Sequence, residues 1–142
     1  MQPVLFDSSI YISALRHGDG AALALRRSAA NEPIWLSAVV LEELYAGALG
    51  RARQVVERLE RDFDRARRIL VPNLSDWAQV GRVLASLAAK YHYESLGPGR
   101  LTNDALIGMS AGRVGITVIT TNERDFGRIA EFRTFPWRVT AL

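Results

Sequence analysis

Short apolar runs alternate along the chain with longer stretches in which apolar residues recur at helical spacing. The runs PVLF, IWL, ILV and ITVIT are rich in β-favouring residues and predict strands, and FRTFPWRVTA near the C-terminus predicts a weaker one. The stretches between them have the periodicity of amphipathic helices. The predicted helices span residues 8–16, 20–30, 38–49, 52–68, 75–93, 102–115 and 123–132. Ser37 is the expected N-cap of the third helix, and Ser75 or Asp76 that of the fifth.

This alternation of strands and helices predicts an α/β fold with a mainly parallel sheet flanked by helices. In such sheets, ligands bind in the crevice at the carboxyl ends of the strands. Asp7 directly follows the first predicted strand, and Asn122 and Asp125 follow the strand ITVIT. We therefore expect these three residues to lie at the same end of the sheet.

Three further acids lie in predicted helices. Helical phase places Asp104 on the same face as Ile107 and Ala111, so its carboxylate should point inward. Glu42 and Glu43 each share a face with nonpolar residues, and phase alone does not choose between them. At least one of the two glutamates is expected to be partly buried.

Each acid also has a purely structural interpretation. Asp7 would serve as the N-cap of the helix that follows it, and Asp104 lies in the first turn of its helix, where the helix dipole favours negative charge. Asn122 and Asp125 are spaced as an N-cap and its third-position partner, similar to a capping box. Taken singly, each acid is more simply explained by structure, so a functional site requires that they converge.

Converging carboxylates repel one another. Two like charges about 4 Å apart repel by roughly 4 kcal/mol at an effective dielectric constant of about 20, so such groups must protonate, separate or bind a cation. The chain has no cysteine, one lysine (Lys90), and two histidines, His17 and His92, in no metal-binding spacing. A hard divalent ion, Mg²⁺ or Mn²⁺, held by oxygen atoms is the predicted partner. On this interpretation, Asp7 is tolerated beside apolar residues because a metal ion lies against it.

Composition narrows the class of protein. A chain of 142 residues that is 49% hydrophobic and 23% charged suits one folded domain. The absence of cysteine excludes a disulfide framework, a thiolate zinc site and a cysteine nucleophile. No apolar run approaches the ~20 residues of a membrane span, and MQPVLFDSS lacks the features of a signal peptide. A cytoplasmic protein without membrane contact is expected, and its net charge of +3 is compatible with a polyanionic partner.

Four segments, in their order and separations, give the chain a resemblance to the PIN-domain family, more narrowly to its VapC-type ribonuclease toxins. These segments are VLFDSSIYI, LSAVVLEELYAG, TNDALIGMSA and VITTNERDF. The resemblance covers almost the whole chain. It implies a single PIN-like domain over residues 1–142, built as a three-layer sandwich with helices on both sides of a mainly parallel sheet. One departure is Gly108, where family members more often carry alanine.

The resemblance also implies roles for individual residues. In the family, a glutamate followed by leucine, two residues and glycine supplies the second acid, which selects Glu43 over Glu42. The implied catalytic and metal-binding set is Asp7, Glu43, Asp104 and Asp125, with Ser9, Thr120 and Asn122 in support. Such a set would bind Mg²⁺ or Mn²⁺ and hydrolyse RNA phosphodiester bonds to leave a 5′-phosphate. The family further implies a cognate antitoxin protein and a homodimer, and it leaves open whether one or two metal ions bind.

The segment RARQVVERLERDFDRARR, residues 51–68, has three possible roles. An acidic site that binds RNA needs positive charge around it, which makes Arg51 and Arg53, together with Arg100 in a predicted loop, candidate RNA contacts. Alternatively, its arginines and acids spaced four residues apart would form a self-paired, solvated helix face. Its apolar stripe would pack on the core or, as the resemblance implies, form part of a groove for an antitoxin helix.

Other functions are less well supported by the sequence. A phosphoacceptor signalling domain would carry a lysine after a late strand, whereas Lys90 lies in a predicted helix. A dinucleotide site is disfavoured because GDG at residues 18–20 does not follow a strand. The remaining alternative is a catalytically silent PIN-like module that binds protein or RNA. Cleavage that requires magnesium and is abolished by a chelator would distinguish the enzyme from this module.

Overall fold

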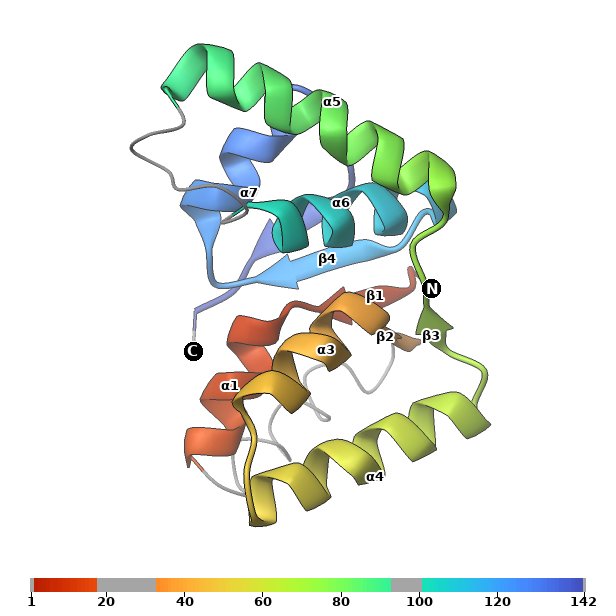
Figure 1. The fold of residues 1–142 in the computed structure, drawn as a ribbon. Coiled ribbons are helices and arrows are strands. Elements are labelled where there is room, and N and C mark those ends of the chain that lie inside the picture. The colour runs from red at the N-terminus through yellow and green to blue at the C-terminus, as the bar shows by residue number, and fades with distance from the viewer. Residues whose placement is uncertain (1, 18–32, 93–100, 142) are drawn as a thin grey trace.

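The computed structural model describes residues 2–17, 33–92 and 101–141, which form a parallel sheet with helices on both sides (Figure 1). The strands are β1 (Val4–Phe6), β2 (Ile34–Ser37), β3 (Ile69–Leu70), β4 (Thr117–Thr120) and β5 (Trp137–Val139). The helices are α1 (Ser8–His17), α3 (Ala38–Gly47), α4 (Arg51–Arg65), α5 (Leu74–Tyr91), α6 (Thr102–Val114) and α7 (Glu123–Ala130). The predicted helix at residues 20–30 and the predicted loop at residues 95–99 lie outside the described residues.

The sheet has the strand order β3-β2-β1-β4-β5, and each pairing is parallel. The predicted α/β fold with its parallel sheet is therefore confirmed, and so is the weak C-terminal strand. In the central pair β1–β4, Phe6 lies opposite Ile119. Because parallel strands end at the same edge of a sheet, this register brings the residues that follow β1 next to the end of β4.

Alternating side chains of the strands supply two layers of core. Leu5 and Val118 are fully buried in the larger cluster, which also contains residues of α3, α4, α5, α6 and α7. Val4 and Phe6 belong to a smaller cluster with Ile10 of α1. Both faces of the sheet are thus covered, as all-parallel sheets require. None of the described helices is long and apolar enough to span a membrane.

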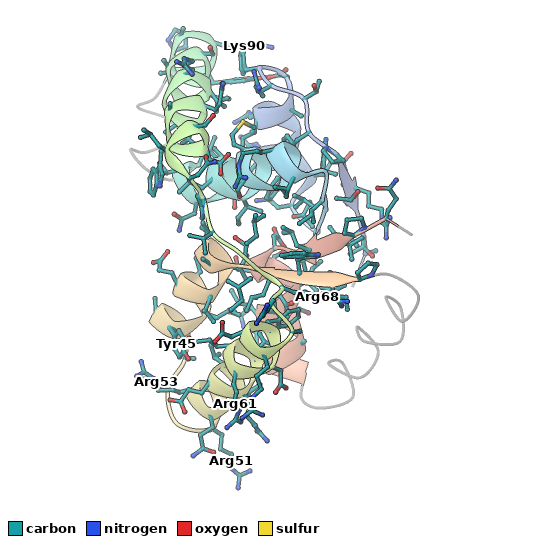
Figure 2. The ribbon with its side chains drawn as sticks, turned by 90° about the vertical axis from the view of Figure 1, so that its right-hand side faces the viewer. Tyr45, Arg51, Arg53, Arg61, Arg68 and Lys90 are labelled. Carbon is teal, nitrogen blue, oxygen red and sulfur yellow. The ribbon has the colours of Figure 1, made fainter. Side chains whose placement is uncertain are left out.

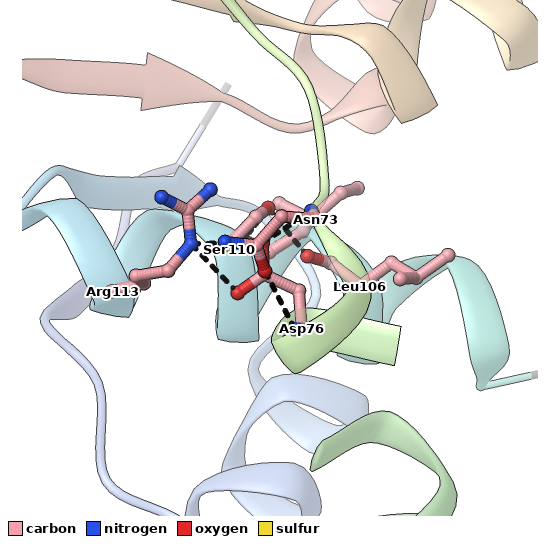
Figure 3. Close-up of polar contacts among 6 residues, drawn as sticks. Asn73, Asp76, Leu106, Ser110 and Arg113 are labelled. Atoms are coloured by element: carbon pink, nitrogen blue, oxygen red, sulfur yellow. Dashed lines mark hydrogen bonds and ion pairs between the residues drawn. The ribbon is translucent and has the colours of Figure 1, made fainter. Parts of the chain in front are cut away.

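An ion pair between the buried Asp76 and the exposed Arg113 joins the start of α5 to the end of α6 (Figure 3). Asp76 is 2% exposed, and Arg113 Nε donates to both of its carboxylate oxygens at 3.0 Å. The N-cap of α5 is Asn73, whose side chain accepts from the Asp76 backbone N–H while the Asp76 carboxylate accepts from the Asn73 N–H. The prediction of Ser75 or Asp76 as the cap was wrong, because the capping box begins two residues earlier than Ser75.

The packing of α6 explains the glycine at position 108. A Cβ atom at Gly108 would lie 3.1 Å from Cζ of the Phe135 ring, and one at Gly112 would lie 3.0 Å from the Phe135 Cβ. Phe135 is buried and therefore fills the notch that these two glycines leave on one face of α6. An alanine at position 108 would press against the aromatic ring. The glycine found here in place of the expected alanine is therefore explained by its contact with Phe135.

Candidate active site

The carboxylate of Asp7 lies at the end of β1 and is held by side chains from two parts of the chain. Its backbone N–H donates to the Ile119 carbonyl at 3.0 Å, which extends the β1–β4 ladder by one residue. Ser9 Oγ donates to Asp7 Oδ1 at 2.5 Å, and Thr120 Oγ1 donates to Asp7 Oδ2 at 2.6 Å. Asp7 is 3% exposed. The predicted convergence of the ends of β1 and β4 is therefore observed.

A chain of hydrogen bonds continues from Thr120 into the first turn of α7. The hydroxyl of Thr120 accepts from the Asn122 backbone N–H at 2.9 Å while it donates to Asp7. Asn122 Oδ1 accepts from the Asp125 N–H at 3.3 Å, and Asn122 Nδ2 donates to Asp125 Oδ2 at 2.9 Å. Asn122 is the predicted N-cap, but the Asp125 carboxylate bonds to the Asn122 side chain rather than closing a full capping box. One network thus links Asp7 to Asp125.

The two glutamates of α3 differ in burial, and at least one is partly buried, as expected. Glu42 is exposed, whereas Glu43 is half-buried, and Glu43 Oε1 is a buried atom without a hydrogen-bond partner among the described residues. Burial raises the pKa of Glu43 above its ordinary value of 4.5; hydrogen bonds from Ser8 and Asn103 lower it, and the charges of Glu42 and Asp7 raise it further. Glu43 therefore points toward the Asp7 end of the sheet.

Asp104 is half-buried in the first turn of α6, as predicted from its helical phase. Its neighbour Asn103 reaches across to α3, where Asn103 Nδ2 donates to Glu42 Oε2 at 3.4 Å. The start of α6 therefore lies beside the glutamates of α3.

Three polar residues of this region were not predicted. Ser8 and Asn103 are hydrogen-bond partners of Glu43, and Thr121 Oγ1 donates to Ser9 Oγ at 2.9 Å. All three directly adjoin predicted site residues in sequence. That adjacency was the available signal, but it does not reveal which side chain turns toward the site.

The protein itself supplies hydrogen-bond partners for the Asp7 carboxylate. Burial raises the pKa of Asp7 above its ordinary value of 3.8, while hydrogen bonds from Ser9, Thr120 and the backbone N–H groups of Ile10 and Ser9 oppose that increase. The N–H groups belong to the first turn of α1, so the N-cap interpretation of Asp7 also holds. The pKa of Asp7 is raised in spite of these hydrogen bonds, so burial still makes its charge costly, and the metal ion expected beside it stays a prediction.

The donor chemistry of the region fits a hard divalent cation. Its acidic side chains offer only oxygen atoms, and Glu43 Oε1 is buried without a partner among the described residues. In residues 2–17, 33–92 and 101–141, however, no three acidic, histidine or cysteine side chains are gathered closely enough to form a ready-made metal site.

We expect Glu43→Gln to stabilise the fold more at neutral pH than in acid. Because the pKa of Glu43 is raised above 4.5, the folded chain retains a proton that the unfolded chain releases as the pH rises from the ordinary value to the raised one. Ionisation of Glu43 in this window lowers the free energy of unfolding. Thermal unfolding of wild type and variant across the window measures the effect. A difference in stability that is independent of pH, or larger in acid, would contradict the raised pKa.

The arginines predicted to contact RNA lie outside the elements that carry the acids. Arg51 and Arg53 are exposed on α4, and the Arg53 guanidinium lies over the Tyr45 ring, 5.8 Å from its centroid (Figure 2). Arg100 lies outside the described residues. The site region is therefore built by β1, α1, α3, α6, β4 and α7, and the basic helix forms a separate surface.

The sequence was compared with models of known protein families. The sequence model of the PIN domain matches residues 4–132, which is most of the chain. The chain belongs to the PIN-domain family. The predicted family is thereby confirmed, and the elements that carry the acids in this PIN domain all lie within the matched residues. No curated protein matches the sequence significantly.

Solved structures with the same fold come from VapBC complexes. A chain of DNA-bound VapBC from Salmonella typhimurium is 21% identical, with 98% of each chain covered and a TM-score of 0.68. A chain of VapBC2 from Rickettsia felis, bound to a promoter DNA fragment, is 22% identical, covering 99% of this PIN domain and 100% of that chain, with a TM-score of 0.67. A chain of VapBC-1 from nontypeable Haemophilus influenzae is 21% identical, covering 97% of this chain and 98% of that chain, with a TM-score of 0.64. These likenesses show a common fold.

Proposed function

We propose that this PIN domain is a magnesium-dependent endoribonuclease and the toxin of a type II toxin–antitoxin pair. The observation that carries the proposal is a pair of partly or fully buried carboxylates, Asp7 and Glu43, which come from separate elements and whose pKa values are both raised by burial. Asp7 also contributes to the raised pKa of Glu43 through its charge. Perturbed carboxylates at the carboxyl ends of parallel strands are typical of catalytic sites.

In this proposal Asp7, Glu43, Asp104 and Asp125 hold Mg²⁺ or Mn²⁺. When bound, such an ion polarises a phosphodiester oxygen, lowers the pKa of a coordinated water and stabilises the departing oxygen. The chain's own residues supply orientation. Ser9 and Thr120 fix the two oxygens of Asp7 by hydrogen bonds of 2.5 and 2.6 Å, and Asn122 fixes one oxygen of Asp125 at 2.9 Å.

Glu43 is the proposed proton acceptor. Its Oε1 has no hydrogen-bond partner among the described residues, so this oxygen can accept a proton without breaking an existing bond. A raised pKa also makes a carboxylate a better base near neutral pH. Water would attack phosphorus in line with the ribose 3′-oxygen, which leaves as a hydroxyl group and gives a 5′-phosphate on the other product.

The proposed partners follow from the structural neighbours. The same fold occurs in chains of VapBC complexes from three bacteria, which supports a cognate antitoxin protein as the partner of this chain. We further propose that the PIN domain acts as a homodimer on cytoplasmic RNA.

Incubation of the purified protein with total RNA, with magnesium or with a chelator, tests this function. The expected result is a set of discrete fragments that carry 5′-phosphates, appear with magnesium and disappear with the chelator. Mapping the fragment ends identifies the substrate. Cleavage that survives the chelator would contradict the proposed chemistry.

One observation favours the alternative of a catalytically silent PIN-like module. The described residues contain no ready-made group of three metal-binding side chains. A silent module would bind protein or RNA without turnover, so the same incubation would leave the RNA intact with or without magnesium. The two functions therefore give opposite results in one experiment.

A further inference from the structure

Four of the five arginines of α4 lie on one flank of the helix, away from most of its acids. Arg51, Arg58 and Arg65 are seven residues apart, and Arg61 lies four residues before Arg65, so the four side chains follow one flank of the helix. All four are exposed. We call these four residues the arginine stripe. At 1.5 Å per residue the stripe is ~21 Å long.

The apolar side of α4 faces the protein core. Val56 is 1% exposed and belongs to the main hydrophobic cluster, against which Leu59 and Phe63 also pack. Of the two roles predicted for this apolar stripe, packing on the core is therefore the one observed. The surface that α4 offers to a partner is polar.

The third side of α4 carries most of its acids and faces α3. Glu57, Glu60 and Asp64 share this side with Arg53. Tyr45 of α3 donates from its hydroxyl to Glu60 Oε1 at 2.5 Å. In Figure 2, Arg53 lies toward Tyr45, whereas Arg51 and Arg61 extend away from the sheet.

Among the described residues, no ion pair involves a member of the arginine stripe. The ion pairs Lys90–Glu131 and Arg113–Asp76 lie on other elements. Asp62 is the one acid of α4 on the flank of the stripe. Of the alternative of a self-paired, solvated helix face, the exposure is therefore observed and the pairing is not.

Charge along the sequence is concentrated in the same segment. Residues 51–68 contain seven arginines and four acids, an excess of three that equals the net charge of +3 of the whole chain. The rest of the chain is neutral overall. A polyanion approaching the protein therefore meets its net positive charge at this segment.

We propose that the arginine stripe binds the phosphate backbone of the RNA substrate outside the acidic site. This inference rests on the proposed ribonuclease function. A row of unpaired guanidinium groups along a rigid helix suits a regularly charged strand, because each group can donate two parallel hydrogen bonds to one phosphate. The alternative partner for the arginine stripe is the acidic surface of another protein.

The test measures RNA binding without cleavage. A labelled single-stranded RNA of mixed sequence is titrated with protein in chelator at several salt concentrations. The double variant Arg58→Gln/Arg65→Gln is compared with the matched control Arg82→Gln/Arg133→Gln, which removes two exposed arginines from other surfaces. Glutamine and arginine have similar helix propensities, and circular dichroism of each variant checks its fold.

Each phosphate contact contributes about 0.7 to the slope of log affinity against log salt for single strands, so the stripe variant should lower the slope by about 1.4. The control should keep the wild-type slope. Equal slopes for wild type and stripe variant, or equal decreases of the slope in both variants, would show that the arginine stripe does not bind RNA. An acidic protein surface would then be the remaining partner for the stripe. Because chelator prevents the proposed cleavage, a failed binding test is distinct from a failed nuclease.

Discussion

Asp7→Asn should abolish RNA cleavage, lowering kcat by roughly a thousandfold or more, while the variant keeps the wild-type fold. The substitution preserves the shape of the side chain and removes its charge, and with it the ability to hold a divalent cation at the end of β1. The hydroxyls of Ser9 and Thr120 now donate to Asp7, and a hydroxyl can reorient to accept from an amide instead. Rates measured on a mapped RNA site, with circular dichroism as the check on folding, give the result.

The matched control for Asp7→Asn is Asp62→Asn, which neutralises an exposed aspartate of α4. Its cleavage rate should stay close to that of wild type. Asp7→Asn should also melt no lower than wild type at neutral pH, because burial raises the pKa of Asp7 and so makes its charge unfavourable to folding. A variant that cuts at the wild-type rate would remove Asp7 from the catalytic machinery, and the proposed site with it.

Glu43→Gln should reduce cleavage by roughly a hundredfold or more, whereas Glu42→Gln should change it by no more than about threefold. The two glutamates are adjacent in α3 and identical in chemistry, yet Glu43 is half-buried with an unpartnered Oε1 and Glu42 is exposed. The pair therefore separates the effect of position from that of removing one negative charge. The measurement is kcat for each variant on the same RNA in magnesium.

Equal losses in both glutamate variants would indicate that the general negative charge of α3 matters rather than one oxygen atom. The reverse order, with Glu42→Gln the weaker enzyme, would contradict the assignment of Glu43. Asn103 donates to Glu42 at 3.4 Å and also lowers the pKa of Glu43. Glu42→Gln should therefore affect cleavage only indirectly, through a small shift of Asn103, and this is the reason for expecting a small change in kcat.

The fold followed from local patterns in the chain. Each apolar run predicted as a strand forms one, because buried parallel strands need continuous apolar sequence and this chain has few such runs. Ser37 caps α3 as expected, since its side chain accepts from the Val39 N–H. The cap of α5 was misplaced because Asn73, Ser75 and Asp76 are all good capping residues. Only the observed hydrogen bonds show that Asn73 begins the helix.

The closeness of the ends of β1 and β4 was predictable from the sequence, but the side-chain contacts there were not. Parallel topology places Asp7 beside Thr120, although the two residues are 113 positions apart, and that could be inferred from the order of strands. The inward position of Glu43 depends on how α3 rotates against the sheet, which helical phase left undecided. One hydrogen-bond partner of Asp7, Thr120, comes from a distant part of the chain, so its contact with the carboxylate could not be read from the local sequence.

The contacts of charged residues on α4 could not be predicted from the sequence either. Spacing of four residues permits ion pairs on a helix, but each pair is worth only about 0.3–0.5 kcal/mol and competes with side-chain entropy and with other partners. On the side of α4 that faces α3, Glu60 accepts a hydrogen bond from Tyr45, and Arg53 lies over the Tyr45 ring. These contacts engage charges on that side of α4, whereas the arginine stripe lies on another side.

The central claim is that the acids of the candidate active site form a shared cation site. The most direct test is to titrate the protein with Mn²⁺ in the absence of RNA and to measure the free Mn²⁺ by electron paramagnetic resonance. The account predicts that the wild-type PIN domain binds Mn²⁺, that Mg²⁺ competes for the same site, and that Asp7→Asn and Glu43→Gln each weaken binding by about tenfold or more. Asp62→Asn and Glu42→Gln should bind as wild type does. Failure of the wild type to bind, or equal binding by all four variants, would contradict a shared cation site formed by these acids.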